Sequence, residues 1–87
     1  MTSQLVIKNR PLEHYILVVF SKILNDGEIT LKGQGSLISK TVDIANIITD
    51  NFLPGELSKK FEDIVEYVQV DSKKHKVSTV IIKLTKK

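Results

Sequence analysis

The apolar positions of the chain follow a helical spacing in two stretches. Over residues 11–25 they recur three and four positions apart, which predicts a helix with Asn9 as its N-cap and residues 25–27 as its stop. The same spacing over residues 36–51 predicts a second helix, with Ser36 as its N-cap. The expected buried stripe of the first helix contains Leu12, Ile16, Val19, Phe20, Ile23 and Leu24, widened by Leu17 and Val18.

Four further segments are rich in β-branched or alternating apolar residues and predict strands. They cover residues 4–8, 28–32, 64–70 and 77–84. Residues 56–60 are expected to be a polar connection, and the charged turn 71–75 joins the last two strands into a hairpin. The order β-α-β-α-β-β predicts an α/β fold of the two-layer α+β kind, in which two helices cover one face of a four-stranded mixed sheet.

Composition narrows the class of protein. The 87 residues suit one domain spanning residues 1–87, and a core this thin favours a dimer. Without cysteine, disulfides and thiolate sites are excluded. The N-terminus lacks the apolar run of a signal peptide and no stretch approaches a membrane span, so we expect a cytoplasmic protein without a membrane partner.

Candidate catalytic groups are few. His14 and His75 lie far apart in the sequence, and neither belongs to a cluster with metal-ligand spacing. Ser36 and Ser39 lack the context of a nucleophile elbow. The carboxylates within residues 62–66 flank a strand, where such groups are usually solvated. The sequence therefore favours a protein that is not an enzyme and holds no cofactor or metal.

Basic residues are the more informative chemistry. The chain carries 13 basic and 10 acidic residues, a net charge of +3, and the bases gather near the end of the chain. The glycine segment 33–36 before the second helix suits either a phosphate site or an ordinary tight turn. Lys40 in the following turns suits either a nearby anion or solvent. The basic segment 73–76 can reach a phosphate backbone without reading bases.

Taken together, four segments resemble the Alba family of archaeal chromatin proteins. They are Val-Ile-Lys-Asn-Arg-Pro at 6–11, Lys-Gly-Gln-Gly-Ser-Leu-Ile-Ser-Lys-Thr-Val-Asp at 32–43, Asn-Phe-Leu-Pro at 51–54 and Lys-Val-Ser-Thr-Val at 76–80. The resemblance implies a fold like the C-terminal domain of translation initiation factor three. It also implies a homodimer whose hairpins extend as arms, and higher assembly on nucleic acid.

The resemblance further implies a sequence-nonspecific, nucleoid-associated protein that binds and condenses double-stranded DNA and also binds RNA through phosphate contacts. It assigns a contact between dimers to Phe52. The nucleic-acid-binding residues expected from the charge pattern and the resemblance are Lys8, Asn9, Arg10, Lys32, Gln34, Ser36, Lys40, Lys73, Lys74, His75 and Lys76.

Two departures from the family keep alternatives open. Gln34 and Ser36 stand where family members usually have arginines, so phosphate contacts are lost. Affinity is then lower than in a typical member, or the chain works in a heterodimer with a more basic Alba-like paralogue. The alternatives are an RNA-directed ribonucleoprotein subunit and a protein–protein adaptor.

Overall fold

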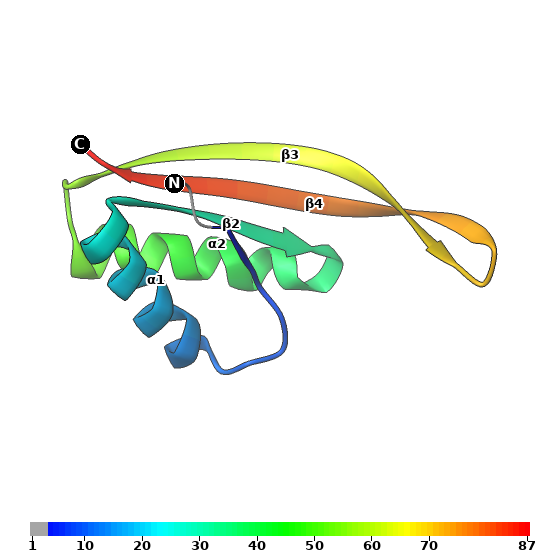
Figure 1. Cartoon of the computed structure of the whole chain (residues 1–87), viewed down its shortest axis with the longest axis horizontal. Helices are drawn as coiled ribbons and strands as arrows, with labels where there is room; N and C mark the ends of the chain where they lie inside the picture. Colours follow the sequence, from blue (N-terminus) through cyan, green and yellow to red (C-terminus); the bar gives the residue numbers. More distant parts are fainter. Residues whose placement is uncertain (1–3) are drawn as a thin grey trace.

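The computed structural model describes residues 4–87, which form a four-stranded sheet with two helices on one face (Figure 1). The predicted order β-α-β-α-β-β is confirmed. Its elements are β1 (Gln4–Val6), α1 (Leu12–Asp26), β2 (Glu28–Gln34), a 3-10 turn (Gly35–Leu37), α2 (Ile38–Ile47), a π-helical turn (Ile48–Phe52), β3 (Leu57–Val70) and β4 (Lys73–Lys86).

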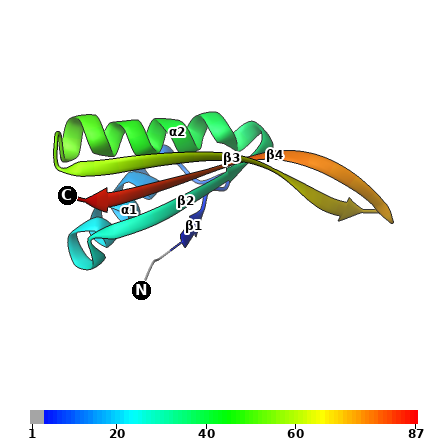
Figure 2. The same cartoon turned by 90° about the horizontal axis from the view of Figure 1, so that it is seen from above.

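The sheet is mixed, as expected. Its strand order is β1-β2-β4-β3, with β1 parallel to β2 and the other pairs antiparallel. The chain reaches β2 from β1 through α1, because parallel neighbours need a crossover connection. Seen from above, α2 runs along the sheet and the β3–β4 hairpin continues past the helices (Figure 2).

The core lies between the helices and one face of the sheet. Alternate residues of β2 and β4 point into it, since successive side chains of a strand lie on opposite faces. These buried sheet residues are Ile29, Leu31, Val80, Ile82 and Leu84. Full burial of each such side chain contributes about 1.5–3 kcal/mol. The helices add Tyr15, Val19, Ile23, Ile44, Ala45 and Ile48.

The observed buried face of α1 is narrower than the sequence predicted. Leu17 is 69% exposed and Leu24 52% exposed, so the prediction that this helix is buried on more than one side is wrong for the single chain. Tyr15 is buried on the core-facing side of α1, although the predicted stripe did not include it. The period of the helix was therefore right, and the width of its buried face was not.

Both predicted N-caps are also wrong. Pro11 occupies the N-cap position of α1 and no side chain caps that helix, so Asn9 lies two residues too early. Ser36 lies inside the 3-10 turn, and α2 begins at Ile38 without a side-chain cap. Gly35, with φ of +55°, allows the chain to turn from β2 into this helical segment.

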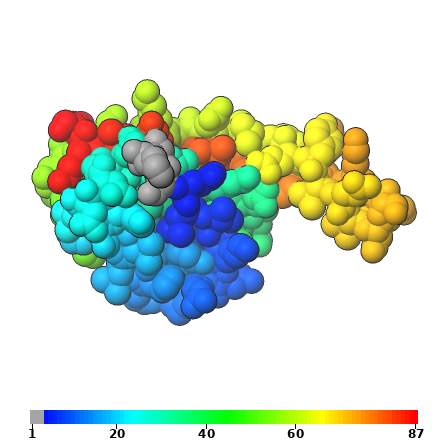
Figure 3. Space-filling view, viewed as in Figure 1, coloured from blue at the N-terminus to red at the C-terminus, as the bar shows by residue number. Residues whose placement is uncertain are grey.

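The hairpin is longer and its turn tighter than predicted. β3 already begins at Leu57, where a polar connection was expected, and β4 begins at Lys73 within the expected turn. Only Asp71 and Ser72 join the strands, with φ values of 51° and 63°. Two consecutive positive values are typical of a type I′ turn, whose twist matches that of the strands. The result is an arm that gives the molecule extents of 44 × 23 × 21 Å (Figure 3).

Candidate nucleic-acid interface

Several of the expected basic residues lie on the side of the helix-covered body from which the arm extends. The loop of residues 8–10 between β1 and α1, the junction between β2 and α2, and the root of the arm all lie on this side (Figure 1). Lys8, Asn9 and Arg10 are exposed. Within residues 4–87 their side chains make no hydrogen bond or ion pair, so the two cationic groups are available for a ligand.

The backbone of this loop is held by hydrogen bonds to two side chains, those of Tyr15 and Lys40. The amide of Lys8 donates a hydrogen bond to the buried hydroxyl of Tyr15, at 2.7 Å. The ammonium group of Lys40 donates to the carbonyl oxygens of Lys8, at 3.5 Å, and of Arg10. The same ammonium lies 5.3 Å from the centre of the Tyr15 ring, within range of a cation–π contact.

The two glycines of the junction serve different purposes. Gly35 supplies the positive φ of the turn. Gly33 lies within β2 with an ordinary φ, and a Cβ there would overlap Oγ1 of Thr41 and lie 2.8 Å from its Cβ. Thr41 is fully buried and donates its hydroxyl to the carbonyl of Leu37. Gly33 is therefore required because α2 packs directly on the strand.

Lys32 and Gln34 share a partner on the face of the sheet that the helices leave open. Lys32 Nζ lies 2.8 Å from one carboxylate oxygen of Glu66, and the side-chain amide of Gln34 donates to the other at 2.9 Å. Glu66 belongs to β3 and lies at the root of the arm. These contacts tie the arm to β2 and neutralise the charge of Lys32.

The arm carries cations on both of its faces. By the register of the hairpin, Lys74 and Lys76 lie on the same face as the core residues of β4, while Lys73 and His75 lie on the opposite face. All four are exposed. A two-stranded ribbon of this kind fits a groove of a duplex, where phosphates flank it on either side.

Phe52 lies away from these cations, at the end of the π-helical turn. It is 46% exposed, and its ring is 5.4 Å from that of Phe20. Leu17 and Leu24 lie one turn before and after Phe20 on α1 and are also exposed. The four residues form an apolar outer surface on α1 and the adjacent π-helical turn.

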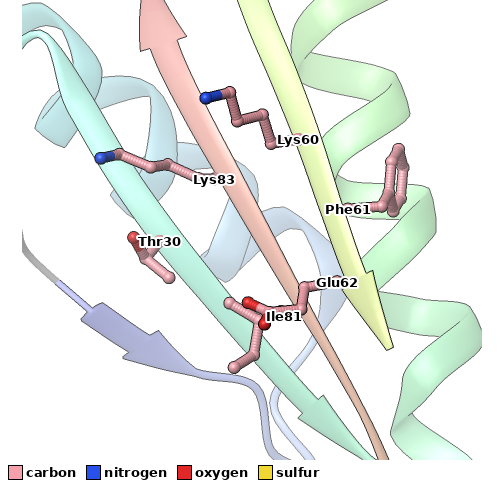
Figure 4. Close-up of a pocket in the computed structure, with 6 residues that line it drawn as sticks. All are labelled: Thr30, Lys60, Phe61, Glu62, Ile81 and Lys83. Atoms are coloured by element: carbon pink, nitrogen blue, oxygen red, sulfur yellow. The ribbon is translucent and has the colours of Figure 1, made fainter. Parts of the chain in front are cut away.

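The open face of the sheet carries a depression of about 350 Å³ that none of the expected site residues lines (Figure 4). Lys60, Glu62, Ile81 and Lys83 point into it, whereas Phe61 points to the other side of the sheet, toward α2. Within residues 4–87, no group of three potential ligands is arranged to hold a metal ion. No helix in this range is long and apolar enough to span a membrane.

The sequence did not single out two residues of this region. Tyr15 was not among the residues predicted to matter, and Glu66 was grouped with the solvated carboxylates of residues 62–66. Their partners lie 7 and 32 residues away in the chain. Tyr15 left one signal, a polar aromatic residue at helical spacing, since a buried tyrosine hydroxyl usually has a hydrogen-bond partner.

Comparison with known proteins gives a consistent result. The family model named Alba matches residues 3–74. A DNA/RNA-binding protein Alba from Methanoculleus marisnigri is 32% identical over 80 residues, covering 91% of this chain and 88% of the relative. DNA/RNA-binding protein Alba 1 from Archaeoglobus fulgidus is 32% identical over 83 residues, covering 93% of this chain and 92% of the relative. Both relatives are named as DNA/RNA-binding proteins, which agrees with the expectation of a binding protein.

Solved structures agree with the fold. Alba from Thermoplasma volcanium superposes with a TM-score of 0.87 at 27% identity, covering 97% of this chain and all of the other. ALBA1 from Trypanosoma brucei superposes with a TM-score of 0.67, covering 97% of this chain and 69% of the other. At 13% identity, the second likeness concerns the fold alone.

Proposed function

This chain belongs to the Alba family, and on that premise we propose that it binds double-stranded DNA and RNA as a dimer, without sequence preference, through the phosphate backbone. The observation that carries the proposal is that an exposed cationic loop lies on the side of the helix-covered body from which an exposed cationic arm extends. Neutralising phosphates releases condensed counterions, a driving force that does not depend on sequence. The names of the curated relatives support the same class of ligand.

The proposed contacts fall into three groups. Lys8, Asn9 and Arg10 form the central loop, and residues 73–76 form the arm. Lys32, Gln34 and Ser36 flank them, but Glu66 already neutralises Lys32, so we assign these flanking residues the smaller share. Lys40, also expected to bind nucleic acid, lies beside the loop, where the carbonyl oxygens of Lys8 and Arg10 accept its hydrogen bonds.

The loop is tested by replacing Arg10 with alanine. A dimer would lose about two phosphate contacts, so the logarithmic salt slope for B-DNA should fall in magnitude by about 1.8, equally for all sequences. The slope is measured by titrating random duplex DNA and RNA at several salt concentrations. The matched control is Lys22→Ala, which removes an exposed charge from the far half of α1 and should leave the slope unchanged.

The same titration separates the alternatives. A preference for RNA over DNA at equal salt would favour a ribonucleoprotein subunit. The adaptor reading is favoured by the missing arginines of the glycine junction together with the neutralised Lys32. No binding to either duplex by the wild-type chain would support it, and a more basic paralogue would then supply the phosphate contacts in a heterodimer.

The proposed dimer is supported by an apolar surface on the arm. Val65 and Tyr67 lie on the side of β3 that faces the core, but beyond the helices, and both are exposed in the single chain. A second copy would cover them, and apolar area removed from water stabilises association. We assign the apolar surface around Phe52 to contacts between dimers that are bound to nucleic acid. Such contacts would condense the nucleic acid, as expected of a nucleoid-associated protein.

Light scattering should therefore report twice the chain mass of 9.8 kDa at micromolar concentration. Val65→Asp would place a charge in the interface and should shift the protein to monomer. Glu62→Asp, on the opposite face of β3, serves as its control. A wild-type protein that stays monomeric under these conditions would contradict the dimer.

A further inference from the structure

The loop of residues 8–10 has no regular secondary structure, so its shape depends on what its backbone groups contact. Among the described residues 4–87, two of its carbonyl oxygens and one of its amides have side-chain partners, and those partners are Tyr15 and Lys40. The amide of Lys8 is bonded to Tyr15 Oη, and the carbonyls of Lys8 and Arg10 accept hydrogen bonds from Lys40 Nζ. Tyr15 lies in α1 and Lys40 in α2, so both helices hold the loop.

The ammonium of Lys40 is already occupied by contacts within the protein. An ammonium has three donors, and two of them are directed at backbone carbonyls. The face of the Tyr15 ring lies on a further side, 5.3 Å away, and Tyr15 itself is only 3% exposed. Lys40 is half-buried, in contrast to the exposed lysines of the arm. A phosphate would therefore have to compete with contacts that Lys40 already makes inside the protein.

We propose that Lys40 is a positioning residue: it holds the backbone of residues 8–10 so that the side chains of Lys8, Asn9 and Arg10 face outward, and it does not itself contact the phosphate. The inference rests on the proposed function for the identity of what the loop binds. It explains why a cation occupies the first turn of α2, where the helix dipole disfavours one. The carbonyl oxygens of the loop offset that unfavourable interaction.

The test compares two lysine-to-methionine variants of the full chain. Lys40→Met keeps the length of the side chain but removes its charge and donors, and Lys74→Met removes one charge from the exposed arm. Amide hydrogen exchange is first measured on the free protein. Lys40→Met should speed exchange of the Lys8 amide at least about tenfold, because this amide stays bonded to Tyr15 only while the loop is held. Lys74→Met should leave it unchanged.

Binding to random duplex DNA then distinguishes positioning from contact. If the loop of Lys40→Met adopts its binding shape about a tenth of the time, affinity falls about tenfold at every salt concentration, with an unchanged slope. Lys74→Met should instead lower the slope by about 1.8 for a dimer. A lower slope for Lys40→Met with unchanged exchange at Lys8 would overturn the inference, because Lys40 would then be a phosphate contact.

Two further measurements keep the result decisive. Tyr15→Phe retains the ring but removes the hydroxyl, and should release the Lys8 amide even if Lys40→Met proves unstable; slow exchange in this variant would overturn the inference. Arg10→Ala tests the proposed function separately. If exchange responds to Lys40→Met but binding does not respond to Arg10→Ala, the positioning role stands and the phosphate role of the loop fails.

Discussion

Replacing Lys73, Lys74 and Lys76 together with alanine is expected to remove most of the salt dependence of duplex binding. A dimer would lose about six phosphate contacts, and at about 0.9 per contact the slope on B-DNA would fall in magnitude by about 5. Between 50 and 200 mM salt, the wild-type protein should then lose about 10³ more in affinity than the variant does. Titrations of one random duplex across that range measure the difference.

The control variant replaces three other exposed lysines of the chain. Lys22, Lys86 and Lys87 are exposed and lie away from the arm, the last two at the opposite end of β4. Replacing these three removes the same charge, so any general effect of net charge appears in both variants. If both lose slope equally, charge acts only at long range and the arm makes no phosphate contact.

Single changes on the two faces of the arm then report how it meets the duplex. Lys73 lies on one face and Lys76 on the other. An arm inside a groove has phosphates on both sides, so each single alanine variant should lose a similar amount of slope. If only one of the two residues matters, the arm lies against the outside of the duplex by that face.

The length of this arm could not be predicted from the sequence, for a physical reason. Residues 57–63 include four charged side chains, and β3 is an edge strand exposed along most of its length. Edge strands commonly carry charges because these discourage pairing with other chains. A polar edge strand therefore has the composition of a loop, and only its pairing with the apolar β4 identifies it. The Asp71-Ser72 turn likewise lacks the glycine that usually marks a type I′ hairpin.

The site divides in the same way. The exposed cations of the loop and the arm could be found from the sequence, because charge and local order suffice to suggest them. The partners of Lys40 and Lys32 could not, since they lie 30 and more residues away along the chain and are brought near by the sheet. Interactions within the site thus required the fold, whereas its charges did not.

Gly33→Ala is expected to be the most destabilising small substitution in this region. The added Cβ would overlap Thr41 Oγ1 and approach Thr41 Cβ to 2.8 Å, and both β2 and α2 are fixed by their own hydrogen bonds. Forcing extra volume into a packed core costs about 1–3 kcal/mol, and the upper end applies because backbone must move. For a domain of this size, the melting temperature should fall by roughly 10–20 °C. Urea unfolding at a fixed protein concentration measures the cost.

A double-mutant cycle with Thr41→Ala identifies the cause. Thr41→Ala removes the overlapping oxygen but leaves the Cβ at 2.8 Å, so Gly33→Ala should cost about 1 kcal/mol less in that background. Additive costs would mean that Gly33 is needed for something other than its contact with Thr41.

The functional consequence of Gly33→Ala follows from the position of Lys40 next to Thr41 on α2. Any shift of α2 away from β2 carries the Lys40 ammonium away from the carbonyls of Lys8 and Arg10, so Gly33→Ala should also speed exchange of the Lys8 amide.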